Sequence, residues 1–327
     1  MSEQPTRNLA MELVRVTEAA AMAAARFQGN GDKDAVDQAA VDAMRRILST
    51  VDMDGTVIIG EGEKDEAPML GNGEKVGNGS PPAVDVAVDP VDGTRLTALG
   101  LDGALAVLAL SERNSMYAPG SLVYMNKIAV GPASAGSVDI NAPVAHNLAQ
   151  VAKARGKSIH DVTAVILDRP RNKSVIEDVR AVGARIKLIS DGDISAAIST
   201  CKQDSGVDIL LGIGGSPEAV TSACALIALG GEQQCKLWPR DDAERAYAQD
   251  HGLDLDQVLT QRHLVNSTNT FFAATGVTSG DLLDGVRYQG HTVRTHSLVL
   301  RSETGTVRFV EAVHDLQRLN KLSEVEY

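Results

Sequence analysis

The feature that most constrains the fold is an alternation of strand and helix patterns after residue 140. Apolar strand patterns at 163–168, 184–190 and 207–214 are separated by stretches with the apolar spacing of helices. Such alternation is typical of a parallel sheet whose strands are joined by right-handed helical crossovers. Ligands of these sheets bind beyond the carboxyl ends of the strands. The pattern therefore predicts an α/β protein with a ligand site at one edge of a sheet.

Polar sequences follow each of the three predicted strands. They are DRPR at 168–171, SDGD at 190–193 and GIGGSPE at 212–218. Arg169 and Arg171 flank a proline that we expect to keep the segment extended, which would make them a rigid pair of cations for a phosphate group. Two exposed loop arginines are the alternative interpretation. A substrate site of this kind requires several strand ends that face one crevice, and these three strand ends would meet that requirement.

The amino-terminal part of the chain combines helices with a second set of strands. Residues 7–26 and 35–51 have helical apolar spacing, and residues 64–82 are expected to form a long loop because they are rich in Gly, Asn and Pro. We expect two domains, an amino-terminal α+β lobe at 1–140 and a carboxy-terminal α/β lobe at 141–327. Strands are predicted at 56–63, 82–90, 104–112 and 121–131, a mostly helical insertion at 237–265, and a hairpin followed by a short helix at 295–316.

Composition limits the classes of protein and partner. A chain of 327 residues suggests two packed lobes, and a formal net charge of -12 argues against a nucleic-acid binder, which needs a surplus of Lys and Arg. No apolar stretch approaches the ~20 residues of a membrane span, and the amino terminus lacks a signal-peptide pattern, so we expect a cytoplasmic protein without membrane partners. The three cysteines lack metal-ligand spacing and are expected to be reduced, structural thiols.

The stretch AVDPVDGTRL at 87–96 places two carboxylates three residues apart around a proline. A β-turn with the proline at its second position would bring Asp89 and Asp92 close enough to bind one cation or two neighbouring cations. Gly93 allows the backbone to turn again, and Thr94 is then expected to cap a helix that starts at the next residue. An ordinary Asp-Pro turn with a capping threonine is the alternative.

Further acidic residues lie where they could join the same site. Asp85 and Asp89 share one face of the predicted strand, so Asp85 is a candidate supporting partner. Hard oxygen ligands without a His or Cys cluster favour Mg²⁺ or Mn²⁺ over structural zinc. Clustered carboxylates repel one another, so the forms with and without metal should differ in stability. The remaining candidates are Asp34 and Asp37 after Lys33, Glu61 and Glu63 after a strand, and Glu218 at a helix start.

The stretch LGIGGSPEA has a partial likeness to a dinucleotide-binding loop. Pro217 occupies the position of the third glycine, and the stretch follows the third parallel strand instead of opening a βαβ unit. A NAD-dependent oxidoreductase is therefore a remote alternative.

The DPVDGT motif at 89–94, with an acidic turn upstream, resembles the lithium-sensitive, metal-dependent phosphatases of sugars and inositols. Nine blocks, in order along residues 7–314, then resemble the class II fructose-1,6-bisphosphatases of bacteria, the GlpX type. The blocks are RNLAMELVRVTEAAA, GDKDAVD, IGEGEKDEAPML, VDPVDGTRLTALG, NKIAVGP, LDRPR, SDGD, GIGGSPE and FFAATGVTSGDLL.

This resemblance implies a layered α/β/α/β/α sugar-phosphatase fold with two sheet-containing lobes. It implies hydrolysis of the 1-phosphate of fructose 1,6-bisphosphate in gluconeogenesis, with two or more divalent ions, Mn²⁺ or Mg²⁺, in a homodimer or homotetramer. The amino-terminal lobe would carry most metal ligands, and the carboxy-terminal lobe the site for the sugar and the remote phosphate. The implied metal ligands are Asp37, Glu61, Asp89, Asp92 and Glu218, and the implied catalytic residues are Thr94, which orients the attacking water, Lys33 and Asp37. The implied substrate contacts are Asp92, Gly93, Thr94, Tyr124, Arg169, Pro170, Arg171, Asp191, Gly192, Asp193 and Gly215.

The chain departs from the family pattern at a few positions. The arginine block ends in Asn172 where the family has histidine, and Ala219 stands where glycine is typical. No implied metal ligand is lost. Because both positions lie near the sugar end in the family pattern, sedoheptulose-1,7-bisphosphatase activity, alone or shared, is an alternative. A paralogue that binds sugar phosphates without hydrolysing them is a more remote alternative, which the retained ligands and Thr94 disfavour.

Overall fold

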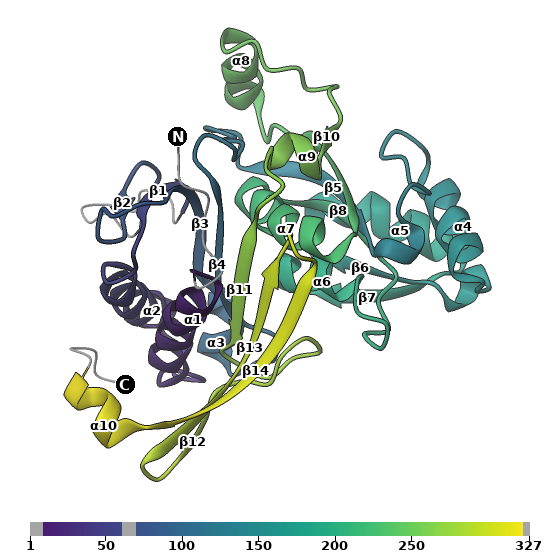
Figure 1. Cartoon of the computed structure of the whole chain (residues 1–327). Coiled ribbons are helices and arrows are strands. Elements are labelled where there is room, and N and C mark those ends of the chain that lie inside the picture. The colour runs from purple at the N-terminus through teal and green to yellow at the C-terminus, as the bar shows by residue number, and fades with distance from the viewer. Residues whose placement is uncertain (1–8, 61–69, 323–327) are drawn as a thin grey trace. The chain divides into compact units, whose positions relative to one another are not determined.

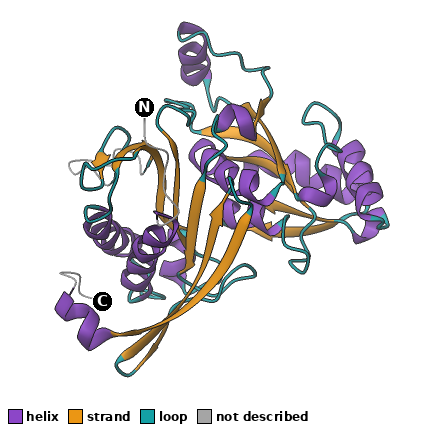
Figure 2. Cartoon of the chain, in the orientation of Figure 1, coloured by secondary structure: helices purple, strands orange, loops and turns teal. Residues whose placement is uncertain are grey.

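The structure is a computed structural model that describes residues 9–60 and 70–322. It contains an eight-stranded and a six-stranded β-sheet, each combined with helices (Figures 1 and 2). The predicted mixed α/β class with two sheets is therefore confirmed. The chain divides into two compact units, Met1–Met116 together with Ser267–Tyr327, and Tyr117–Asn266.

These units follow the sheets and not the order of the chain. We expected a division near residue 140, whereas the chain leaves the first unit after Met116 and returns to it at Ser267. The returning segment joins the first sheet because β11 (Phe271–Gly276) pairs antiparallel with β4 (Leu105–Glu112). Pairing between strands that are far apart in the sequence therefore sets the division.

The first unit is a mixed sheet with helices α1 and α2 on one face (Figures 1 and 2). Its strand order is β12-β13-β11-β4-β3-β1-β2, with β14 added to β13. Among the described strands of this sheet, only β1 and β3 are parallel neighbours. An alanine-rich face of α1 packs with strand residues such as Val86 and Leu108 in one apolar core. The predicted carboxy-terminal hairpin and short helix are confirmed as β13, β14 and α10. The remaining elements of this unit are α1 (Leu9–Ala25), α2 (Lys33–Leu48), β1 (Asp54–Ile59), β2 (Lys75–Val76), β3 (Ala83–Asp92), α3 (Thr94–Leu99), β12 (Arg287–Gln289), β13 (Thr292–Arg301), β14 (Thr306–Asp315) and α10 (Leu316–Leu322).

The second unit contains the three predicted parallel strands, which are confirmed as β6, β7 and β8. The sheet order is β10-β9-β5-β8-β6-β7, and β5 pairs antiparallel with both β8 and β9, so the whole sheet is mixed. Apolar residues of α4 and α5 pack on one face, and those of α6 and α7 pack on the other. The elements are β5 (Tyr124–Val130), α4 (Val144–Arg155), β6 (Thr163–Leu167), α5 (Lys173–Val182), β7 (Arg185–Ile189), α6 (Asp193–Ser199), β8 (Ile209–Gly215), α7 (Ser216–Leu229), β9 (Glu232–Leu237), α8 (Asp242–Asp250), β10 (Leu259–Thr260), α9 (Gln261–Leu264) and three short 3₁₀ turns, η1 (Pro132–Ser134), η2 (Ile159–Asp161) and η3 (Pro170–Asn172).

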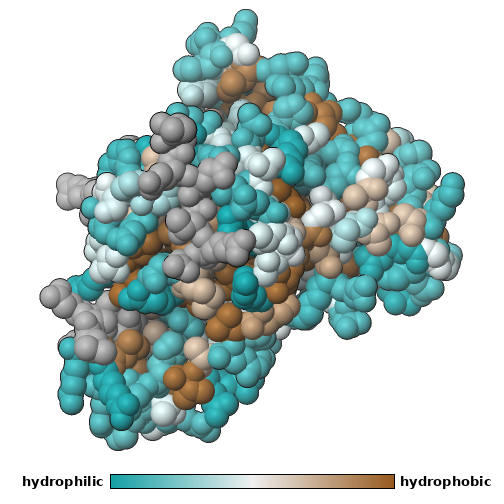
Figure 3. All heavy atoms as spheres, viewed as in Figure 1, coloured by the Kyte–Doolittle hydropathy of each residue, from teal (hydrophilic) through white to brown (hydrophobic). Residues whose placement is uncertain are grey.

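The predicted helical insertion at 237–265 contains α8 and α9, and hydrophilic residues predominate over α8 in Figure 3. The predicted loop at 64–82 falls partly outside the described residues, and its described part includes the short strand β2. Within residues 9–60 and 70–322, no helix has the length and apolar character needed to cross a membrane.

Candidate functional site

The DPVD segment is the end of a strand and not a β-turn. β3 continues to Asp92, and its pairing with β4 is irregular because three residue steps, Asp89 to Asp92, face two steps, Val107 to Leu105. Proline has no N–H for a strand ladder, and a β-bulge is one of the few positions where a strand accepts it. The predicted turn is therefore wrong, but a half-buried Asp89 and a buried Asp92 still share the end of one strand.

Gly93 and Thr94 connect β3 to helix α3. Gly93 is the N-cap residue with a φ of 96°, which glycine adopts at little cost, and a Cβ there would lie 2.9 Å from Leu96 Cδ1. Thr94 is the first residue of α3, and the helix has no side-chain cap. The prediction that Thr94 caps this helix is therefore wrong, because glycine occupies the cap position.

The Thr94 hydroxyl joins two of the predicted site segments. It lies 2.6 Å from Asp37 Oδ1 on helix α2 and donates a hydrogen bond to that carboxylate. The segment before α2 is also tied to α3 by a backbone hydrogen bond of 2.8 Å from Gly31 N–H to the carbonyl of Ala98. The fold therefore holds a predicted metal ligand against the residue predicted to orient water.

The other predicted residues of the first unit lie in different settings. Lys33 is exposed as the first residue of α2. Glu61 and Glu63 lie outside the described residues. Asp85 accepts hydrogen bonds from the backbone N–H groups of Ser115, at 2.8 Å, and of the next residue, at 3.1 Å. Asp85 thus stabilises the turn after β4. Its supporting role beside Asp89 stays a prediction.

The two arginines of the DRPR block have different partners. Pro170 opens a 3₁₀ turn, η3, so the expected extended backbone is wrong beyond Arg169. The Arg169 guanidinium lies 3.4 Å from Asp191 Oδ1. Arg171 Nε donates to the carbonyl oxygen of Ile213, at the end of β8, at 3.1 Å. Each guanidinium is thus held by a neighbouring strand end, which positions both cations beyond the sheet.

Tyr124, at the start of β5, is surrounded by cations and an aromatic ring. Arg171 Cζ lies 4.2 Å from the centre of the Tyr124 ring and Arg240 Cζ lies 5.8 Å from it, within the range of cation–π attraction. The Trp238 ring meets Tyr124 edge-on with centroids 6.2 Å apart. Sequence reasoning missed Trp238 and Arg240, which lie in the segment predicted as a mostly helical insertion. The available signal was LWPR, an aromatic and basic sequence at the end of the strand EQQCKL.

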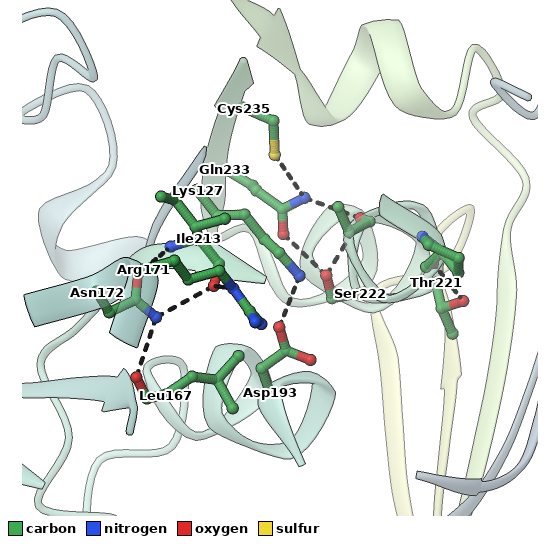
Figure 4. A network of polar contacts seen from close by, with 12 residues as sticks. Lys127, Leu167, Arg171, Asn172, Asp193, Ile213, Thr221, Ser222, Gln233 and Cys235 are labelled. Carbon is green, nitrogen blue, oxygen red and sulfur yellow. Dashed lines mark hydrogen bonds and ion pairs between the residues drawn. The ribbon is translucent and has the colours of Figure 1, made fainter. Parts of the chain in front are cut away.

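Asp193, the first residue of α6, forms a buried ion pair with Lys127 of β5, which sequence reasoning also missed (Figure 4). Lys127 Nζ lies 2.7 Å from Asp193 Oδ2, and the lysine is 3% exposed. Burial by itself lowers the pKa of Lys127, but the carboxylates of Asp193 and Glu218 outweigh it, so the pKa is raised above its ordinary value. Lys127 is therefore cationic inside the protein. A lysine inside the apolar pattern YMNKIAV was the available signal.

Gly215 and Glu218 lie where β8 passes into α7. Gly215 is the N-cap residue and Glu218 lies in the first helical turn, where a carboxylate interacts favourably with the helix dipole. A Cβ at Gly215 would lie 1.7 Å from Glu218 Oε2. A Cβ at Gly214 would lie 2.2 Å from Asp193 Oδ2. The two glycines therefore leave the space that both carboxylates occupy.

Asn172, the position that departs from the family pattern, is fully buried and binds only backbone atoms in its hydrogen bonds (Figure 4). Its Nδ2 donates to the carbonyls of Leu167, at 3.0 Å, and Ile213, at 3.1 Å, and its Oδ1 accepts from Ile213 N–H at 2.6 Å. The side chain thus ties the ends of β6 and β8 together. Its expected place near the sugar end of the substrate stays a prediction.

The convergence of five acidic ligands stays a prediction. Among residues 9–60 and 70–322, no three His, Cys, Asp or Glu side chains are arranged to hold a metal ion. Glu61 lies outside that part of the chain, and Glu218 belongs to a different compact unit from Asp89 and Asp92. The predicted ligand atoms on each unit are carboxylate oxygens, which fit the preference of Mg²⁺ and Mn²⁺.

Comparison with known proteins gives a consistent result. Residues 7–314 match the family model described as bacterial fructose-1,6-bisphosphatase, glpX-encoded. The chain is 45% identical over 326 residues to fructose-1,6-bisphosphatase 1 class 2 of Escherichia coli strain K12, covering 95% of this chain and 96% of the relative. It has the same identity and coverage with the class 2 fructose-1,6-bisphosphatases of Escherichia coli O6:H1 and Shigella flexneri.

Proposed function

The chain belongs to the glpX-encoded family of bacterial fructose-1,6-bisphosphatases, and we propose that it hydrolyses the 1-phosphate of fructose 1,6-bisphosphate in gluconeogenesis. The products are fructose 6-phosphate and inorganic phosphate, which makes the protein a phosphoric monoester hydrolase. The observation that carries this conclusion is the family match over residues 7–314, together with 45% identity over nearly the whole length of class 2 relatives.

We infer that divalent cations, Mn²⁺ or Mg²⁺, are held by Asp37, Glu61, Asp89, Asp92 and Glu218. Bound cations neutralise phosphate oxygens and lower the pKa of a bound water. The Thr94 hydroxyl donates its proton to Asp37 at 2.6 Å, which leaves its lone pairs to accept a hydrogen bond from a water. Thr94 would thus fix the direction of the attacking water. Asp37 would receive, through the Thr94 hydroxyl, the proton that the water loses. Lys33, exposed beside Asp37 on α2, would add positive charge near the phosphate.

The second unit supplies the groups for the sugar and the remote phosphate. Arg169 and Arg171 provide bidentate donors for phosphate, and Tyr124 packs against the Arg171 guanidinium and restricts its direction. The carboxylates of Asp191 and Asp193 can accept hydrogen bonds from sugar hydroxyls. Binding energy at this remote end positions the reacting phosphate, so its loss should lower turnover as well as affinity.

A phosphate-release assay over sugar bisphosphates and monophosphates tests the function. With Mn²⁺ or Mg²⁺, we expect release of one phosphate per fructose 1,6-bisphosphate, no release in EDTA, and slow release from the monophosphates. The ratio of kcat/KM for fructose and sedoheptulose bisphosphates decides between the two sugars. Tight binding of the bisphosphate without phosphate release would instead support the non-hydrolysing paralogue.

We propose that the protein assembles as a homodimer or homotetramer. Sedimentation equilibrium across a hundredfold range of concentration measures the mass of the assembly. A mass equal to that of one 34.4 kDa chain at every concentration would contradict this proposal.

A further inference from the structure

The buried ion pair at Lys127 lies under the start of two helices. On β5, Lys127 is opposite Gly212 of β8 and Cys235 of β9. The next residue on the same strand face, Ala129, packs in an apolar cluster with residues of α6 and α7. Lys127 therefore extends from the sheet face that these two helices cover. Its side chain runs past Gly214, where a Cβ would lie 2.8 Å from Lys127 Cε.

Two carboxylates from those helices lie at the same strand end. Asp193 opens α6 and binds Lys127 Nζ at 2.7 Å, and Glu218 lies in the first turn of α7. The adjacent residues Gly214 and Gly215 border Lys127 and Glu218, respectively. A Cβ at Gly214 would lie 2.9 Å from Lys127 Nζ, and a Cβ at the next residue would lie 1.7 Å from Glu218 Oε2. The raised pKa of Lys127 has the charges of both carboxylates among its causes.

We propose that Lys127 is a positioning residue that fixes Asp193 by direct contact and orients the Glu218 carboxylate by its charge. The inference rests on the proposed function, in which Asp193 contacts the sugar and Glu218 binds a divalent cation. Lys127 would touch neither substrate nor metal and would act through these two side chains.

The location of the Lys127–Asp193 ion pair favours a role in positioning site residues over a role in stabilising the fold. A buried ion pair is often no more stable than apolar residues of the same volume, because both charges lose their hydration. Here the pair lies at the carboxyl end of β8, the edge where parallel sheets bind ligands. Groups that hold a metal ligand in place typically change metal affinity about 10–100-fold when removed.

The test compares two chains in which residue 193 carries no charge, so neither contains an unpaired aspartate at that position. Lys127→Met alone leaves Asp193 as an unpaired buried carboxylate and risks unfolding, so Lys127→Met is combined with Asp193→Asn. The reference is Asp193→Asn by itself, and folding of each chain is checked by circular dichroism. Mn²⁺ affinity is measured without substrate, from the electron paramagnetic resonance signal of unbound Mn²⁺.

We expect the double variant to bind Mn²⁺ about 10–100-fold more weakly than Asp193→Asn. When Glu218→Gln is added to both chains, removing Lys127 should change Mn²⁺ affinity less than about threefold, because the side chain through which it acts is gone. As a control, Asp208→Asn disturbs a buried carboxylate that binds Arg155 and Lys157 elsewhere in this unit. It should lower thermal stability and leave Mn²⁺ affinity unchanged.

Unchanged or tighter Mn²⁺ binding in the double variant would overturn the role of Lys127, as would an equal loss with and without Glu218. These outcomes are separate from the proposed function. A wild-type chain that releases no phosphate from fructose 1,6-bisphosphate refutes the hydrolase, while the Mn²⁺ titrations still decide the role of Lys127. A hydrolase without the Lys127–Glu218 dependence refutes only the positioning role.

Discussion

At the scale of single residues, the contact between Thr94 and Asp37 shows how the fold prepares a catalytic group. A threonine hydroxyl is a poor base, but a carboxylate at 2.6 Å fixes the direction of its proton and of its lone pairs. Thr94 can hold this orientation because it is the first residue of α3, directly after a glycine with positive φ. The proposed hydrolysis therefore depends on the Thr94 hydroxyl keeping a single orientation.

Replacing Thr94 by Val, which has nearly the same shape, should reduce kcat about 100-fold or more, because the hydroxyl that orients water is lost. The fold should lose only about 1 kcal/mol, the typical net contribution of a hydrogen bond. Steady-state phosphate release and urea unfolding measure the two effects. Thr94→Ser keeps the hydroxyl and should keep most of the activity. Val and Ser variants of equal activity would contradict the assigned role.

The cysteines provide a second test at this scale. Burial raises the pKa of Cys201 to about 11 and those of Cys224 and Cys235 to about 12, so each thiol favours its protonated form in the folded chain. The unfolded chain loses these protons first, so their contribution to stability is lost as pH rises from about 9 towards 11–12. We expect slow reaction with a thiol reagent at pH 8 in the folded protein and fast reaction in urea. Rapid labelling of all three native thiols would contradict this.

At the scale of secondary-structure elements, the site depends on how strand ends are held. The bulge in β3 accommodates a proline and keeps Asp89 and Asp92 at one strand end. In the second sheet, Asn172 fastens the ends of β6 and β8, and the same Ile213 carbonyl accepts the hydrogen bond of Arg171. Polar side chains at these ends therefore fix the strands that carry the predicted ligands.

Asn172→Ala should lower the free energy of unfolding by about 2–4 kcal/mol, because it leaves buried backbone groups of Ile213 and Leu167 without their side-chain partner. KM for the sugar bisphosphate should rise, because Arg171 binds the same Ile213 carbonyl oxygen that loses the hydrogen bond from Asn172. Urea unfolding and steady-state kinetics measure these changes. Asn266→Ala, at an exposed asparagine of the same unit, is the control and should change stability by less than about 0.5 kcal/mol. A loss of similar size in both variants would contradict the role of the tie.

At the scale of the whole molecule, the chain passes between two compact units twice. The second passage brings β11 back beside β4 and makes β11 and β13 part of the first sheet. Part of the first unit's core, including the buried Phe271 and Val299, therefore comes from the carboxy-terminal end of the chain. The second unit is continuous in sequence.

A fragment of residues 117–266 is therefore expected to fold by itself, whereas a fragment of residues 1–140 should not. The fragment of residues 117–266 contains a complete sheet with helices on both faces, whereas the fragment of residues 1–140 lacks β11, which pairs with β4. Circular dichroism and cooperative urea unfolding of the two fragments measure this. Cooperative unfolding of the 1–140 fragment would favour the boundary near residue 140.

Metal binding should stabilise the protein, because carboxylates that repel one another gain a counter-charge. At a Mn²⁺ concentration 100 times the Kd, the expected gain is about 2.7 kcal/mol, seen as a rise in the melting temperature that EDTA reverses. A variant with Asp89 and Asp92 both changed to Asn should lose most of this rise. An equal rise in the variant would show that the ion binds elsewhere.

The amino-acid sequence by itself determined most helices, the three parallel strands, the final hairpin and the family. These features depend on periodicity within about ten residues or on short motifs such as DPVDGT, which are visible without a fold. Only the tertiary structure decided that β11 joins the first sheet, that DPVD forms a bulge, and that Lys127 pairs with Asp193. The physical reason is that strand pairing and buried charge pairs depend on partners tens to hundreds of residues away, which a local pattern does not specify.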